Sequence, residues 1–198
     1  MEELERRRNV VFFLGSPGAG KGTMCRRLAQ KYGFEHVSVG DLLRREEGTV
    51  GSVYGPVIRV LGKHVPPEIT LELLKCAIAE RKADTFLLDG FPRSLDLLKG
   101  WNADMADRFP LKFVLFLDCP GEICRMRIVR RAEQGSGRPD DRSITFSERQ
   151  QRFMTQTMRV INHFYGTNAV VRVDSRASNP DAVFQDVDRV FRAYFGLS

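Results

Sequence analysis

The chain has 198 residues, 42% of them hydrophobic and 28% charged, with a formal net charge of +6, and these are the proportions of a soluble globular protein of one domain. No apolar run approaches the roughly 18 to 20 residues of a membrane span and residues 1–9 are charged, so we expect no membrane contact and a cytoplasmic protein, with the nucleus as a further compartment. The four cysteines form no C-x-x-C pair, which argues against a zinc site and against a disulfide framework.

The first predicted element is a buried strand, the apolar run 10–14. It leads into a glycine-rich turn and a lysine that fit the pattern G-x-x-x-x-G-K, and a helix follows as far as Tyr32. Glycines let successive backbone N–H groups converge on phosphate oxygens, and the positive end of the helix faces the same anion. We therefore predict a phosphate-binding loop at residues 15–23, with Gly22 where the general pattern has a hydroxyl and Thr23 following it.

Strands and helices alternate along the rest of the chain. Further strands are predicted at residues 35–39, 86–89, 113–117 and 170–173. The predicted helices begin at Gly40, Pro56, Ile69, Ser94, Pro120, Thr145 and Asn179, and the one from Thr145 runs to a stop at Gly166. This alternation predicts an α/β fold with a five-stranded parallel sheet, helices on both faces, and ligands outside the carboxyl ends of the strands.

Two further features carry chemistry. Asp89 ends an apolar strand beside the predicted loop, where a carboxylate can hold Mg²⁺ through water; a helix cap is the alternative role. Residues 133–141 contain no apolar side chain that could join a core, so we predict a loop or lid there. Arginines lie on both sides of this segment. A solvated charged face explains this charge but not the preference for arginine over lysine. The planar, forked guanidinium group of arginine suits phosphate.

Several motifs occur in a fixed order: G-x-P-G-x-G-K-G-T at residues 15–23, S-x-G-D-L-L-R at 38–44, V-P at 65–66, D-G-F-P-R at 89–93 and G-R-x-D-D at 137–141. Together they resemble the short-lid nucleoside monophosphate kinases of the adenylate kinase family, over nearly the whole chain from Asn9. Segments 100–102 and 117–124 look most similar to the uridylate-cytidylate kinase branch. The resemblance implies the P-loop NTPase fold in a single domain, with an acceptor-binding lobe at about 39–66 and a lid at about 131–141.

The resemblance also implies an activity: transfer of the γ-phosphoryl group of ATP, with Mg²⁺, to UMP or CMP, with dCMP as a further acceptor, by a monomer. Phosphoryl transfer needs no nucleophilic side chain, because positioning and charge neutralisation do most of the work. One alternative is an adenylate kinase that accepts AMP, and another is a catalytically silent relative that binds nucleotides as a scaffold. A basic nucleic-acid-binding protein is the third, although no basic tail or aromatic-interleaved basic repeat supports it.

Site residues follow from the same resemblance. The implied catalytic groups are Lys21, Arg93, Arg131, Arg138 and Arg149. The implied ATP contacts are Gly15, Pro17, Gly18, Ala19, Gly20, Lys21, Gly22, Thr23, Arg127, which would stack on the adenine, and Arg176. The implied acceptor contacts are Ser38, Val39, Gly40, Arg44, His64, Val65, Gly90, Phe91, Arg93 and Leu97. Mg²⁺ would be held by Thr23 and, through water, by Asp89, and the lid would be anchored by Asp140 and Asp141.

The position of Leu97 departs from the family's pattern. Adenylate kinases commonly have a glutamine there and a threonine at the position of Val39, and pyrimidine kinases have an asparagine at the position of Leu97. The threonine and the glutamine are both absent, so AMP should be a poor acceptor. Val39 resembles the small apolar residue that pyrimidine kinases usually have at its position, so UMP and CMP should be preferred, with weaker discrimination than a pocket carrying the asparagine would give. The lid run 131–138 is also longer than in the family, which leaves the register of Arg131 open.

Overall fold

The computed structural model describes residues 8–61, 65–135 and 143–197, and of residues 143–145 the backbone alone. Four predicted site residues, His64, Arg138, Asp140 and Asp141, therefore lie outside the described residues.

One parallel sheet organises the described part of the chain, with its five strands in the order β2-β3-β1-β4-β5. The strands are β1 (Asn9–Gly15), β2 (Glu35–Ser38), β3 (Thr85–Asp89), β4 (Leu111–Asp118) and β5 (Val170–Asp174). The predicted five-stranded parallel sheet is confirmed. Because β1 is central and the chain crosses first to one side of it and then to the other, a crevice forms at its carboxyl end.

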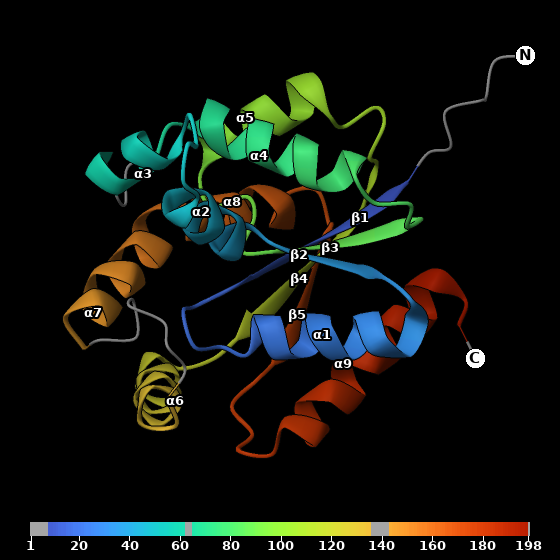
Figure 1. Cartoon of the computed structure of the whole chain (residues 1–198). Coiled ribbons are helices and arrows are strands. Elements are labelled where there is room, and N and C mark those ends of the chain that lie inside the picture. The colour runs from blue at the N-terminus through green and yellow to red at the C-terminus, as the bar shows by residue number, and fades with distance from the viewer. Residues whose placement is uncertain (1–7, 62–64, 136–142, 198) are drawn as a thin grey trace, which may run out of the picture.

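Helices cover both faces of this sheet (Figure 1). Val10, Phe12 and Leu14 of β1 face a core cluster that includes residues of α2, α4, α5 and α8, whereas Val11 and Phe13 face a second cluster with α1, α6 and α9. The two-residue period of a strand explains this alternation. The described α-helices are α1 (Lys21–Tyr32), α2 (Val39–Gly48), α3 (Gly55–Leu61), α4 (Pro67–Ala79), α5 (Leu95–Asp104), α6 (Gly121–Glu133), α7 (Ser143–Arg152), α8 (Met158–Tyr165) and α9 (Pro180–Phe195).

Most helix ends follow local sequence signals. Gly33 ends α1 with φ 69°, Ser94 caps α5 by accepting a hydrogen bond from the N–H of Leu97, and Asn179 caps α9 in the same way. One predicted strand was too long: Val39 belongs to α2, because the Ser38 side chain accepts from the N–H of Asp41 and so begins the helix one residue earlier.

The predicted helix from Thr145 to Gly166 is not uniform. It begins already at Ser143, so Thr145 is not its cap, and a π-helical segment η2 (Phe153–Thr157) separates α7 from α8. The Thr157 hydroxyl donates to the carbonyl oxygen of Arg93 at 3.1 Å, which ties η2 to the turn after β3. Such π-helical insertions are frequent at functional sites.

The first residues of the predicted lid are helical. Helix α6 runs to Glu133, so Arg131 lies in its last turn rather than in a loop.

Among the helices of residues 8–61, 65–135 and 143–197, none is both long and apolar enough to cross a bilayer.

Candidate active site

A cavity of about 860 Å³ opens at the carboxyl ends of β1, β2 and β3. It is lined by twenty of the residues predicted for the site: Gly15, Pro17, Gly18, Ala19, Gly20, Lys21, Gly22, Thr23, Ser38, Val39, Gly40, Arg44, Val65, Asp89, Gly90, Arg93, Leu97, Arg127, Arg131 and Arg149. Sequence segments more than 100 residues apart thus meet in one cavity, as parallel strands with a common carboxyl edge require.

The loop between β1 and α1 wraps closely around its lysine. Gly18 adopts φ 89° and lies so near the carbonyl oxygen of Cys124 that a Cβ atom there would overlap it, so both backbone angle and space require glycine. Lys21 Nζ donates to the carbonyl oxygens of Gly15 at 2.8 Å and Ser16 at 3.0 Å. Burial lowers the pKa of Lys21 to about 8; the negative charge of Asp89 opposes this shift, and the positive charges of Arg93 and Arg149 add to it.

Asp89 lies at the end of β3 against the first turn of α1. Burial would raise its pKa, but the hydrogen bond from His36, whose Nε2 is 3.3 Å from Asp89 Oδ2, and the positive charge of Lys21 outweigh burial and hold the pKa below its usual value. A Cβ atom on Gly22 would lie 3.1 Å from Asp89 Oδ2. This contact gives a physical reason for glycine where the general loop pattern has a hydroxyl: the ionised carboxylate occupies that space.

Arg44 and Arg93 converge at the start of α2. A Cβ atom on Gly40 would lie 3.3 Å from Arg93 Nη2 and 3.4 Å from Arg44 Nη1, so both guanidinium groups reach the same backbone position. Arg93 is held there by a 2.8 Å hydrogen bond from its Nε to the carbonyl oxygen of Gly90, and Arg44 is also paired with Asp41. Two guanidinium groups at the N-terminus of a helix form a site for an anion.

Positive charge is concentrated in the middle of the cavity. Desolvation and then the positive charge of Arg149 lower the pKa of Arg93, and both arginines also depress that of Lys21. Arg130, one of the arginines that flank the predicted lid, and Arg152, for which the sequence suggested no role, line the same cavity. Like charges at close range repel, and a polyphosphate ligand would remove that repulsion.

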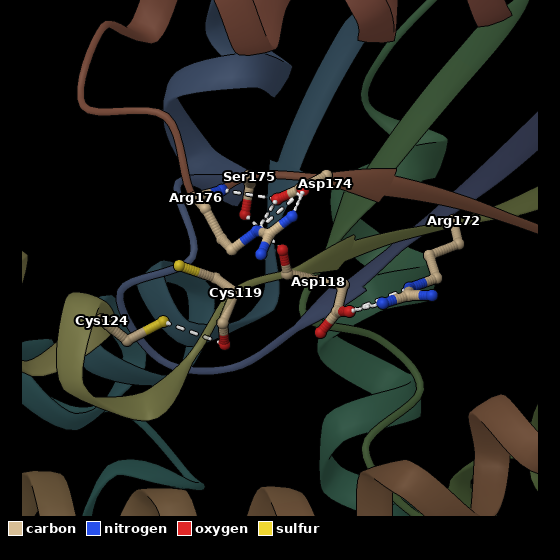
Figure 2. A network of polar contacts seen from close by, with 7 residues as sticks. All are labelled: Asp118, Cys119, Cys124, Arg172, Asp174, Ser175 and Arg176. Carbon is tan, nitrogen blue, oxygen red and sulfur yellow. Dashed lines mark hydrogen bonds and ion pairs between the residues drawn. The ribbon is translucent and has the colours of Figure 1, made fainter.

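Arg127 lines the cavity from α6. Its Nη2 donates to the carbonyl oxygens of Ser175 at 2.8 Å and Ala177 at 2.7 Å, which fixes the guanidinium plane between α6 and the segment that follows β5. Arg176, predicted to contact ATP, does not line the cavity; it pairs with Asp174, its Nε lying 2.8 Å from Oδ2 (Figure 2). The local carboxylate two residues earlier thus holds this arginine at the surface.

Phe91, predicted to contact the acceptor, lies outside the cavity as well. Its side chain is fully buried in the core, where it packs edge-on against Phe12 and Trp101, and it does not line the cavity.

Contacts that sequence patterns missed join distant segments. The Ser16 hydroxyl, inside the glycine-rich loop, donates to Gln150 Oε1 on α7, the neighbour of Arg149. His36 supports Asp89 from β2, which pairs with β3 in the structure. The predicted parallel sheet, with its common carboxyl edge, gave a partial signal for this contact. The link from Ser16 to Gln150 has no such signal.

A lysine-bearing glycine loop after a central parallel strand, with a carboxylate at the end of the adjacent strand, defines a P-loop nucleotide-binding protein. The family model for adenylate kinase matches residues 13–169, and this chain belongs to that family. Similar curated proteins are named UMP-CMP kinase. The one from Gallus gallus is 44% identical over 92% of this chain and 96% of its own length, and the one from Homo sapiens is 42% identical over the same shares. A protein named UMP-CMP kinase 2 from Caenorhabditis elegans is 43% identical over 93% of this chain and 97% of its own.

Proposed function

We propose that this protein transfers the γ-phosphoryl group of ATP to a pyrimidine nucleoside monophosphate, UMP or CMP, and releases ADP and the nucleoside diphosphate. One observation carries the proposal: a single cavity holds two anion sites, the loop with Lys21 and the pair Arg44 and Arg93 at the start of α2. A kinase needs two such sites, because donor and acceptor phosphates must meet in line. Similarity to the UMP-CMP kinases supports the pyrimidine acceptor.

The donor nucleotide extends from the loop to Arg127. Loop amides and Lys21 neutralise the phosphates, and the fixed guanidinium plane of Arg127 suits stacking on a flat base, next to Ala177 and Pro180, which also line the cavity. Arg93 and Arg149 neutralise charge on the transferred group. The predicted contributions of Arg138, Asp140 and Asp141, and closure of the lid and the acceptor lobe to exclude water, are retained as parts of this proposal.

The cavity residues also fit Mg²⁺. Asp89 stays ionised, and Thr23 lines the cavity directly after Gly22, whose backbone lies beside Asp89. The described residues contain no cluster of three or more acidic, cysteine or histidine side chains that could hold a metal. Such a sparse set suits an ion that takes most of its ligands from phosphates and water. When bound, Mg²⁺ would neutralise negative charge on the phosphate oxygens that it contacts.

The alternatives fit less well. An AMP acceptor leaves the polar edge of adenine without the threonine and glutamine of adenylate kinases, because Val39 and Leu97 line the cavity there. A silent scaffold does not need Lys21, Arg93 and Arg149 gathered in one cavity.

The test is a coupled assay of ADP release with UMP, CMP, dCMP and AMP in turn, at fixed ATP and Mg²⁺. We expect the highest kcat/KM with UMP and CMP. A clear preference for AMP would replace the acceptor while keeping the kinase, and no turnover with any monophosphate despite measurable ATP binding would favour the silent scaffold.

A further inference from the structure

Apolar residues of α2, α3, α4 and α5, together with Val65, form a wall of the cavity that suits the base of the acceptor. Val39, Ile58, Val65, Pro67 and Leu97 line it, and no amide side chain takes the place that Leu97 occupies. A base bound there still presents hydrogen-bonding groups at its edge, and burying them without a partner is unfavourable. The wall therefore lacks an evident group to recognise the base.

Thr70 is the exception in this wall. Thr70 is only 5% exposed and lines the cavity. Within the described residues, its hydroxyl makes no hydrogen bond. Other hydroxyls on the acceptor side are engaged: Ser38 and Ser94 cap helices, and Thr157 donates to Arg93. Because buried hydroxyls normally have partners, an unpartnered one beside a ligand cavity points to the ligand.

Thr70 and Leu97 lie on two helices, α4 and α5, that pack against each other. Pro67 and Thr70 lie one turn apart on α4 and both line the cavity. Leu71 follows Thr70 and lies against Gly100 of α5 so closely that a Cβ atom on Gly100 would overlap it. Leu97 is one turn before Gly100 and packs on the same core cluster as Leu71. The two residues thus stand on adjoining helices along the same wall.

We propose that the Thr70 hydroxyl recognises the exocyclic group at ring position 4 of the acceptor pyrimidine, in place of an amide at position 97; this inference rests on the proposed kinase function. A hydroxyl can donate one hydrogen bond and accept others, and it rotates to suit its partner. It donates to the oxygen of uracil and accepts from the amine of cytosine. One residue thereby serves UMP and CMP about equally, and it rejects neither.

The experiment compares Thr70→Val, which keeps the shape and removes the hydroxyl, with the unaltered enzyme on three acceptors. These are UMP, CMP and the 2-pyrimidinone ribonucleoside monophosphate, which has no substituent at position 4. We expect Thr70→Val to lower kcat/KM about tenfold for UMP and for CMP, as for one lost hydrogen bond. With the third acceptor the two enzymes should be equal within about twofold. Thr70→Ser should retain most of the activity.

Thr85→Val is the matched control. Thr85 is also 5% exposed, but it begins β3, at the opposite end of the strand from Asp89, and does not line the cavity. We expect its kcat/KM values to match those of the unaltered enzyme. An equal loss for all three acceptors, or no loss for any, overturns the role of Thr70, with Tm of each variant measured to confirm folding. Absence of UMP and CMP turnover in the unaltered enzyme would instead overturn the proposed function.

Discussion

The phosphate end and the base end of this cavity are built in different ways. At the phosphate end, backbone groups, buried charges and hydrogen bonds fix each group: Lys21 has two carbonyl partners, and Arg93 is held through Gly90. At the base end, apolar side chains such as Val39 and Leu97 form a wall with few polar groups. Phosphate recognition therefore depends on backbone geometry that single substitutions rarely recreate, whereas base selectivity depends on a few replaceable side chains.

The largest expected effect separates activity from stability at the phosphate end. Lys21→Met should lower kcat by about 100- to 1,000-fold, since it removes charge that stabilises the transferred group. It should also raise Tm, because burial in the folded protein lowers the pKa of this lysine to about 8 and so disfavours its charged form. Activity assays and thermal unfolding at pH 7 measure both.

Lys31→Met is the control from the same helix. Lys31 Nζ binds Asp188 at 2.7 Å, away from the cavity. This variant should have a lower Tm and an unchanged kcat, whereas Lys21→Met should have a higher Tm and a lower kcat. Near-normal turnover in Lys21→Met would refute the assignment of the loop.

Arg93 lies between the two ends, and its loss should affect both rate and acceptor binding. We expect Arg93→Ala to reduce kcat/KM by about 100-fold, with the KM of the acceptor rising more than the KM of ATP. Steady-state kinetics with each substrate varied in turn measures this. Arg189→Ala, which removes an exposed arginine of α9, should leave both values unchanged. An Arg93→Ala enzyme with altered KM for ATP alone would contradict the division of the cavity.

The link between the loop and α7 should matter less. Gln150→Leu removes the acceptor of the Ser16 hydrogen bond and should lower kcat about 3- to 10-fold, because Arg149 next to it loses a fixed position relative to the loop. Gln151→Leu changes the exposed neighbour and should have no effect on kcat. If the two variants behave alike, the hydrogen bond does not position Arg149.

The smallest expected effect is the uptake of a proton by Lys21 when ATP binds. The free protein holds Lys21 with a pKa of about 8, and bound phosphates favour its charged form. At pH 8.5 most free protein therefore has neutral Lys21, and ATP binding should take up roughly 0.7 of a proton, against less than about 0.1 at pH 7. ATP affinity should fall as pH rises through 8. Calorimetry in two buffers of different ionisation enthalpy measures the uptake, and Lys21→Met should abolish it.

Local rules predicted much of the fold and of the phosphate end. The glycine loop, the alternation of strands and helices, and the caps at Ser94 and Asn179 depend on neighbouring residues, so their signals stand in the sequence. The missed contacts depend on tertiary packing: Ser16 and Gln150 are 134 residues apart, and no periodicity brings them together. The pairing of Arg176, predicted to contact ATP, with the carboxylate two residues earlier is likewise a contact that the sequence analysis did not foresee.

The π-helical segment η2 has a consequence for the helical phase of its neighbours. An α-helix turns about 100° per residue, so one extra residue within a turn rotates everything after it by about that angle. Arg149 and Arg152 of α7 can therefore line the cavity while Ile161 and Phe164 of α8 still point into the core. Deleting one residue within η2 would leave a regular α-helix with the same relative phase, whereas forcing the full-length segment into α-helix would rotate α8 by about 100° relative to α7 and turn one of the two faces away from its target.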